Sequence, residues 1–189
     1  MMALFTGKGD SGTTKLFDTP SGARVSKSAS IFETLGMLDE LNTLVGWCKV
    51  AVPEEFQIAG RSCKEILHEV QDHLFTIQAE VAGAGKSVAS SSVEALSALI
   101  RKIEKELPKI KTFLVPGGTE LSARLDITRA VSRRVERRLV SLHESGERVI
   151  SGSSRAYANR LSSLFYALVR LTNHRGGILE ISPHYRNEK

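Results

Sequence analysis

A glycine-rich stretch near the start of the chain, GKGDSG, has the composition of a phosphate-binding loop. Gly7, Gly9 and Gly12 fit the dinucleotide fingerprint, and the two outer glycines alone fit most of a P-loop. Both motifs follow a buried strand and open a helix. Residues 1–5 are too short for that strand, the next expected helix begins only near residue 30, and Thr13 stands where the P-loop lysine belongs. The stretch is therefore neither motif.

The stretch still has the chemistry of an anion site, because closely spaced glycines let several backbone N–H groups converge on one anion. Hydroxyl and ammonium groups stand around the glycines, from Thr6, Ser11, Thr13, Thr14, Lys8, Lys15 and Lys27. We interpret the stretch as a candidate anion-binding loop, with a mobile N-terminal tail as the alternative.

A row of arginines in the segment TELSARLDITRAVSRRVERRLVSLHE forms the second candidate site. Arg129, Arg133 and Arg137 are four residues apart, so successive side chains advance only about 40° around a helix. Such a row repels itself unless anions or carboxylates lie opposite, and guanidinium groups suit forked contacts with phosphate. The row predicts an anion site, with a solvated charged face as the alternative. Arg134 and Arg138 stand further round the same helix, and Glu136 is expected to lie beside Arg129 and Arg133.

Two apolar segments also carry polar residues that need partners. Asp39 and Glu40 interrupt GMLDELN, and a carboxylate beside a buried seam needs a cationic partner, which the arginine row could supply. A purely structural ion pair is the alternative for Asp39. In YANRLSSLFYALVR, a polar row faces away from the leucines, and its first member could read a ribose or base; the row is Asn159, Ser163, Tyr166 and Arg170.

Five helices are expected to position these residues. Apolar residues recur at steps of three and four over 38–52, 66–81, 93–107, 121–142 and 157–171, which predicts one buried face in each segment. Ser91 with Glu94 predicts a capping box, the fourth helix should open near Thr119, and the fifth should stop near Gly176. No run of alternating strand residues stands out, so the fold class is all-α. Heptad-like spacing with short loops favours a left-handed up-and-down bundle.

Composition fits one soluble domain. The chain has 189 residues, 41% of them hydrophobic and 25% charged, and a moderate net charge of +5, which is ordinary for a globular protein. No apolar run approaches the roughly 20 residues of a membrane span. With no visible targeting segment, a cytoplasmic location is expected. Cys48 and Cys63 lack metal-ligand spacing and are expected to be buried free thiols in a reducing compartment.

Five motifs, in order, resemble the PduO-type ATP:cob(I)alamin adenosyltransferases. They span residues 5 to about 172 and read TGKGDSGTT, ETLGMLDELN, FLVPGGTELSARL, TRAVSRRVERR and YANRLSSLFYALVR. The resemblance implies one domain over 1–189, with an ATP-binding segment (1–29), a five-helix bundle (30–175) and a C-terminal tail (176–189). It also implies a homotrimer with active sites between subunits, the substrates ATP and cob(I)alamin, Mg²⁺, and a cob(II)alamin reductase as a partner.

The resemblance also implies roles for single residues. Lys27 and Arg137 would hold the triphosphate while Mg²⁺ bridges its phosphates, with no protein ligands for the metal assigned. Asn159 would help to fix the nucleotide, and Asp39 would pair with Arg133 on the corrinoid side. The nucleotide cradle would comprise Thr6, Gly7, Lys8, Gly9, Asp10, Gly12, Thr13 and Thr14. Arg129, Arg134 and Glu136 would either contact phosphate or support the side chains that contact it.

Phe113, just before the PGG turn, would exclude a lower axial ligand of the corrinoid and so ease reduction of Co(II) to Co(I); ordinary core packing is the alternative. Two positions depart from the family pattern. Ser163 replaces the aspartate of NRLSD, and Asp126 stands where a histidine is common. Two other classes stay open: an ATP- and corrinoid-binding regulator without turnover, and a basic helical module that binds nucleic acid through the arginines.

Overall fold

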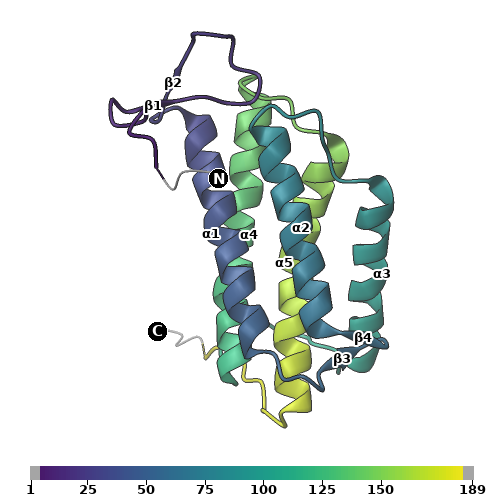
Figure 1. Ribbon diagram of the computed structural model, residues 1–189. Coiled ribbons are helices and arrows are strands. Elements are labelled where there is room, and N and C mark those ends of the chain that lie inside the picture. The colour runs from purple at the N-terminus through teal and green to yellow at the C-terminus, as the bar shows by residue number, and fades with distance from the viewer. Residues whose placement is uncertain (1–4, 185–189) are drawn as a thin grey trace, which may run out of the picture.

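The computed structural model describes residues 5–184, so the expected N-terminal segment and C-terminal tail are described only in part. The described chain is a five-helix bundle (Figure 1). Its helices are α1 (Ser30–Ala51), α2 (Cys63–Val81), α3 (Ser90–Glu106), α4 (Glu120–Glu144) and α5 (Gly152–Arg175). Successive helices run in opposite directions, which confirms the predicted all-α, up-and-down architecture.

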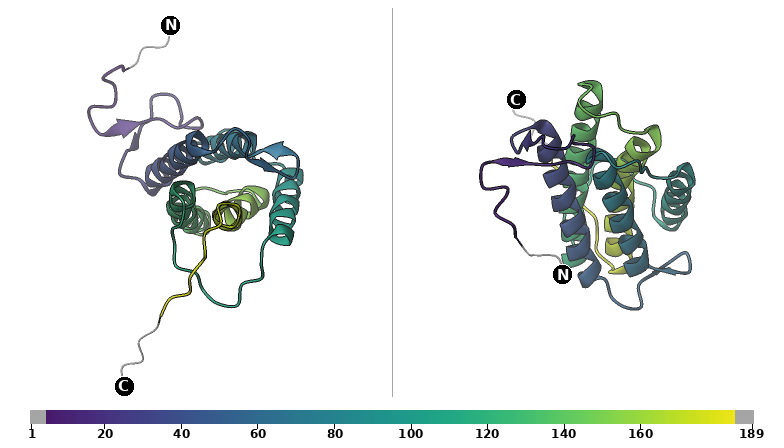
Figure 2. Two further views of the ribbon diagram at one scale, coloured as in Figure 1. Left: turned by 90° about the horizontal axis from the view of Figure 1, so that it is seen from below. Right: turned by 45° about the horizontal axis from the view of Figure 1, so that its top comes forward.

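Four of the helices surround the core, and α3 lies at one edge, packed against α5 (Figure 2). α1 contacts both α2 and α4, and α4 contacts α5. The apolar seams predicted from the sequence face inward: Leu38, Leu41, Leu74, Leu139 and Leu161 are all fully buried. Two antiparallel hairpins complete the described elements, β1 (Thr13–Thr14) with β2 (Val25–Ser26) and β3 (Gln57–Ile58) with β4 (Arg61–Ser62).

Two of the three predicted helix boundaries are confirmed. The Thr119 hydroxyl accepts a hydrogen bond from Ser122 N at the start of α4, and Gly176 follows the last residue of α5. The capping box at Ser91 is wrong, because α3 begins one residue earlier and Ala89 is its N-cap without a side-chain bond. Val88 is buried in the bundle, which fixes where the chain enters α3. Ser91 therefore lies inside the first turn, where it cannot cap.

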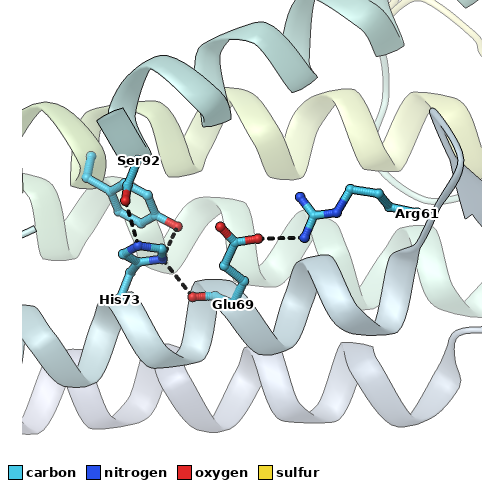
Figure 3. Close-up of polar contacts among 5 residues, drawn as sticks. Arg61, Glu69, His73 and Ser92 are labelled. Carbon is cyan, nitrogen blue, oxygen red and sulfur yellow. Dashed lines mark hydrogen bonds and ion pairs between the residues drawn. The ribbon is translucent and has the colours of Figure 1, made fainter. Parts of the chain in front are cut away.

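A polar cluster joins the first turn of α3 to α2 and α5 (Figure 3). His73 on α2 has Nδ1 2.8 Å from Glu69 O and 3.2 Å from the Tyr157 hydroxyl, and Nε2 3.0 Å from Ser92 Oγ. Glu69 also pairs with Arg61 at 2.7 Å. Burial raises the pKa of Tyr157, so its hydroxyl stays protonated at neutral pH. The adjacent cavity measures only about 20 Å³, so this cluster holds helices together rather than a ligand.

Cys48 and Cys63 are free and buried, as predicted. Burial raises the pKa of the Cys48 thiol and raises that of Cys63 to about 12. Over residues 5–184, no helix is both long and apolar enough to cross a membrane.

Candidate active site

The glycine stretch lies outside the bundle, in the segment that precedes α1 (Figure 1). It folds as two consecutive turns, with Asp10 N donating to Gly7 O at 3.2 Å and Gly12 N to Gly9 O at 3.1 Å. Gly7 and Gly12 have φ values of 67° and 76°, which only glycine adopts without strain. The stretch then enters β1, where Thr13 pairs with Ser26. The loop is therefore an ordered hairpin in this structure, although no P-loop or Rossmann architecture surrounds it.

The second strand of the hairpin brings a cation to the loop. Lys27 follows β2 directly, and its backbone N–H donates to Gly12 O at 2.9 Å. Its ammonium Nζ lies 3.0 Å from the point where a Cβ on Gly9 would stand. A side chain at Gly9 would therefore displace this ammonium, and glycine is what allows the close approach. Lys27 and Gly9 were both predicted to bind the nucleotide, and the hairpin brings them next to each other.

The segment is tied to the bundle at two places that the sequence does not signal. Phe17 N donates to Ala82 O at 2.9 Å, and the Asp18 carboxylate accepts from Arg148, in the α4–α5 connection, at 2.5 and 3.2 Å. The Arg148 hydrogen bond lowers the pKa of Asp18. Ser30, the first residue of α1, also donates to Glu147. Because the partners stand more than 60 residues apart along the chain, no local periodicity could have identified these contacts.

The arginine row lies on α4 as predicted, and its members differ in their contacts. Arg133 and Arg137 are exposed, and neither makes an ion pair within the described part of the chain. Arg129 is half-buried and lies 3.6 Å from the Asp126 carboxylate, while Arg134 pairs with Glu40 at 2.7 Å. Of these four arginines, Arg133 and Arg137 are therefore the ones that are both exposed and unpaired within the described residues, and so available to an anion.

Glu136 faces α5 rather than the arginine row. Its carboxylate accepts a hydrogen bond from the Asn159 amide, whose oxygen in turn accepts from Arg160 at 2.7 Å. Glu136 was predicted to lie beside Arg129 and Arg133. Within the described residues it makes no ion pair with either and instead joins α4 to α5. Asn159 is exposed beside this contact.

Asp39 is exposed on α1 and lines a cavity of about 400 Å³ with Phe17, Leu35 and Phe75. The two phenylalanine side chains that line it are largely exposed, Phe17 at 75% and Phe75 at 60%. Within the described chain Asp39 has no ion-pair partner, and the neighbouring Glu40 takes Arg134 instead. The pairing of Asp39 with Arg133 does not occur within one subunit and stays a prediction for the assembly.

Phe113 is not a core residue. Its side chain is 81% exposed and lines the wall of a cavity of about 830 Å³, together with Leu114, Arg129, Tyr166 and Pro183. The Arg129 guanidinium lies 5.7 Å from the centroid of the Tyr166 ring, within the range of a cation–π contact. The lining of this cavity combines apolar side chains with two basic ones, Lys111 and Arg129. It shares no lining residue with the Asp39 cavity.

The PGG turn behind Phe113 is fixed by buried side chains. Gly117 N donates to the Asp126 carboxylate at 3.0 Å, and Gly117 O accepts from the Asn173 amide at 3.1 Å. Asp126 therefore contacts both the turn and Arg129 of the row. At Gly118, φ is 139° and a Cβ would stand 2.3 Å from Asn173 Oδ1, so the turn requires glycine there.

The polar row predicted on α5 divides into two parts. Ser163 is exposed and, with Tyr166, borders a neighbouring cavity of about 390 Å³. Arg170 lines the same cavity, although it is only 7% exposed. Its guanidinium donates to Glu180 at 3.1 Å and to Pro108 O at 2.9 Å, because the C-terminal segment folds back over this end of α5. The predicted row therefore holds from Ser163 to Arg170, which line one cavity, but Arg170 is covered by its own partners.

No cluster of three or more His, Cys, Asp or Glu side chains suited to a metal ion occurs within residues 5–184.

Comparison with known proteins places these features in one family. The family model described as cobalamin adenosyltransferase matches residues 4–172. The corrinoid adenosyltransferase PduO of Citrobacter freundii is 36% identical over 180 residues, which cover 92% of this chain and 50% of that protein. The corrinoid adenosyltransferase of Bacillus subtilis is 33% identical over 191 residues, covering 95% and 91%. The chain thus spans about half the length of the PduO relatives and nearly all of the shorter ones.

Solved structures agree. A phenylalanine-to-alanine variant of the PduO-type ATP:corrinoid adenosyltransferase of Lactobacillus reuteri, complexed with cobalamin and ATP, superposes with a TM-score of 0.85 at 26% identity, covering 98% of this chain and all of that one. An arginine-to-lysine variant of that protein, complexed with ATP, gives a TM-score of 0.84 at 26% identity and covers 96% of this chain. The chain belongs to the cobalamin adenosyltransferase family.

Proposed function

We propose that this protein is an ATP:cob(I)alamin adenosyltransferase. It would transfer the 5′-deoxyadenosyl group of ATP to the Co(I) ion of a corrinoid and release triphosphate. The observation that carries the proposal is the Lys27 ammonium held against Gly9 inside an ordered glycine hairpin, in a chain of this family. That pairing supports the proposal because a cation beside the backbone N–H groups of a glycine loop suits the phosphates of a nucleotide.

The chemistry asks the protein to stabilise a leaving group. Co(I) attacks C5′, a Co–C bond forms, the C5′–O bond breaks, and its electron pair stays on the triphosphate. Preorganised cations facing the oxygens that gain charge are a large catalytic contribution, with one donor worth roughly 3 kcal/mol. Lys27 and the two exposed arginines, Arg133 and Arg137, are suited to this role. Mg²⁺, bound through the phosphates, would neutralise part of the same charge.

We assign the corrinoid to the cavity beside Phe113. Its volume of about 830 Å³ and its mixed lining suit a large ligand with an apolar ring and polar substituents. Phe113, mostly exposed in that wall, would occupy the space that a lower axial ligand needs. Removal of that ligand lowers the electron density at cobalt and so eases reduction of Co(II) to Co(I).

A homotrimer would complete the site. Asp39, Arg133 and Arg137 are exposed and without ion-pair partners in one described chain, and Phe17 and Phe75 expose apolar surface beside Asp39. An adjoining subunit would cover this surface and bring Arg133 of one chain to Asp39 of the next. A cob(II)alamin reductase would supply the electron. The buried free thiols suit a reducing compartment such as the cytoplasm.

The test is direct turnover. The protein, ATP, Mg²⁺ and chemically reduced cobalamin are mixed, and conversion to adenosylcobalamin is followed by absorbance, with Lys27→Ala as the impaired control. Bound ATP without conversion would favour a regulator that has lost turnover. Steeply salt-dependent binding to DNA or RNA with no response to cobalamin would favour a nucleic-acid module. Against that module, Glu40, Asp126 and Glu136 lie among the arginines.

A further inference from the structure

Arg24, which lies between the two strands of the glycine hairpin in sequence, directs Nε and one terminal nitrogen of its guanidinium group into the loop. Nε donates to Thr13 Oγ1 at 2.6 Å. One terminal nitrogen donates to Lys8 O at 2.7 Å and to Thr13 O at 2.6 Å. One side chain thus joins both sides of the glycine stretch. We propose that Arg24 is a positioning residue that shapes the glycine loop for the triphosphate before nucleotide binds.

The geometry of the peptide group shows how this contact would act. In a trans peptide the C=O and the following N–H point in opposite directions. Binding Lys8 O to Arg24 therefore turns the Gly9 N–H away from the guanidinium. Among the described residues the Gly9 N–H has no hydrogen-bond acceptor, and Gly9 is also the residue beside the Lys27 ammonium. An unpaired amide donor and a cation thus meet at one residue, whose orientation depends on Arg24.

The second effect is on the carbonyl groups. Carbonyl oxygens that face an anion repel it, and Arg24 holds two of them, Lys8 O and Thr13 O. Without this contact, a stretch rich in glycine samples many backbone conformations. The entropy of ordering it would then oppose nucleotide binding. Arg24 acts through the loop backbone, so its removal should weaken ATP binding more than it slows the chemical step.

This inference rests on the proposed function for its kinetic part and is independent of it for its structural part. The structural measurement is amide hydrogen exchange of residues 7–14 in the nucleotide-free protein, for wild type, Arg24→Ala and Arg24→Lys. The kinetic measurement is KM and kcat for ATP and for cob(I)alamin in the same three proteins. Arg61→Ala is the matched control, because the Arg61 guanidinium also donates an exposed hydrogen bond, to Glu69, but lies away from the glycine segment.

Arg24→Ala should raise exchange in residues 7–14 about tenfold and raise KM for ATP about tenfold, while kcat and KM for cob(I)alamin stay within about twofold. Arg24→Lys should be intermediate, since an ammonium group lacks the fork that holds several acceptors. A raised KM for ATP with unchanged exchange would overturn the proposal, because it would make Arg24 a direct phosphate contact. Unchanged exchange and kinetics, or the same response from Arg61→Ala, would overturn it as well. Absence of turnover in wild type would instead refute the proposed function, and the exchange result would still decide the role of Arg24.

Discussion

Replacing Gly118 by alanine tests how the turn behind Phe113 is built. The new Cβ would stand 2.3 Å from Asn173 Oδ1 and 2.8 Å from its Cγ, so the buried Asn173 side chain must move. That movement breaks its bonds with Gly117 O and Thr119 N, at about 1 kcal/mol each. The φ of 139° adds about 1–2 kcal/mol of backbone strain. The expected loss in free energy of unfolding is about 3–4 kcal/mol.

Gly146→Ala is the matched control, because Gly146 has a φ of 76° but nothing within 4 Å of a new Cβ. It should lose only the strain, about 1 kcal/mol. Both free energies are measured by urea unfolding followed by circular dichroism, with unchanged m values required. In an Asn173→Ala background, Gly118→Ala should cost only its backbone strain, about 1–2 kcal/mol. Equal losses for the two glycines in the native background would refute the role given to Asn173.

Three further predictions concern the site. Lys27→Ala and Arg137→Ala should each lower kcat/KM for ATP about 100-fold in the adenosylation assay, and an unchanged KM for cob(I)alamin would separate phosphate contact from misfolding. Phe113→Ala should spare turnover of pre-reduced Co(I) more than turnover that starts from Co(II); equal losses would contradict ligand exclusion. Arg148 lowers the pKa of Asp18 from 3.8, so this contact stabilises the fold above about pH 4, and its contribution fades as the pH falls through the lowered pKa. The difference in unfolding free energy between wild type and Asp18→Asn, measured against pH, should shrink as the pH falls through that window. A difference that grows on acidification would contradict the predicted sign.

The helices could be predicted from the sequence because their information is local. Leucine and valine seams at three- and four-residue steps gave the buried faces, and Thr119 and Gly176 gave two boundaries, since each acts through neighbouring backbone groups. The start of α3 could not be predicted in this way. It depends on Val88, which is buried and whose N–H donates to Ser154 Oγ on α5, more than 60 residues away in the sequence.

The site was predicted in its residue types more than in its contacts. Glycine spacing predicted a loop of turns and arginine spacing predicted a row on one helix, and the structure has both; that they bind an anion stays a prediction. Which arginine is free, however, depends on carboxylates brought by other segments of the chain, such as Glu40 on α1 for Arg134 and Glu180 after α5 for Arg170. Arg24 carried no distinguishing signal, because a lone arginine in a hydrophilic segment is usually a solvated side chain.

The chemical state of Cys48 and Cys63 has a practical consequence. They are the only cysteines in the sequence, and with the pKa of Cys63 near 12, neither offers appreciable thiolate to maleimides or other alkylating reagents at neutral pH. A reporter cysteine introduced on the surface of the hairpin would therefore react alone. A fluorophore or spin label could then follow movements of the segment in the native background, with both original thiols left in place.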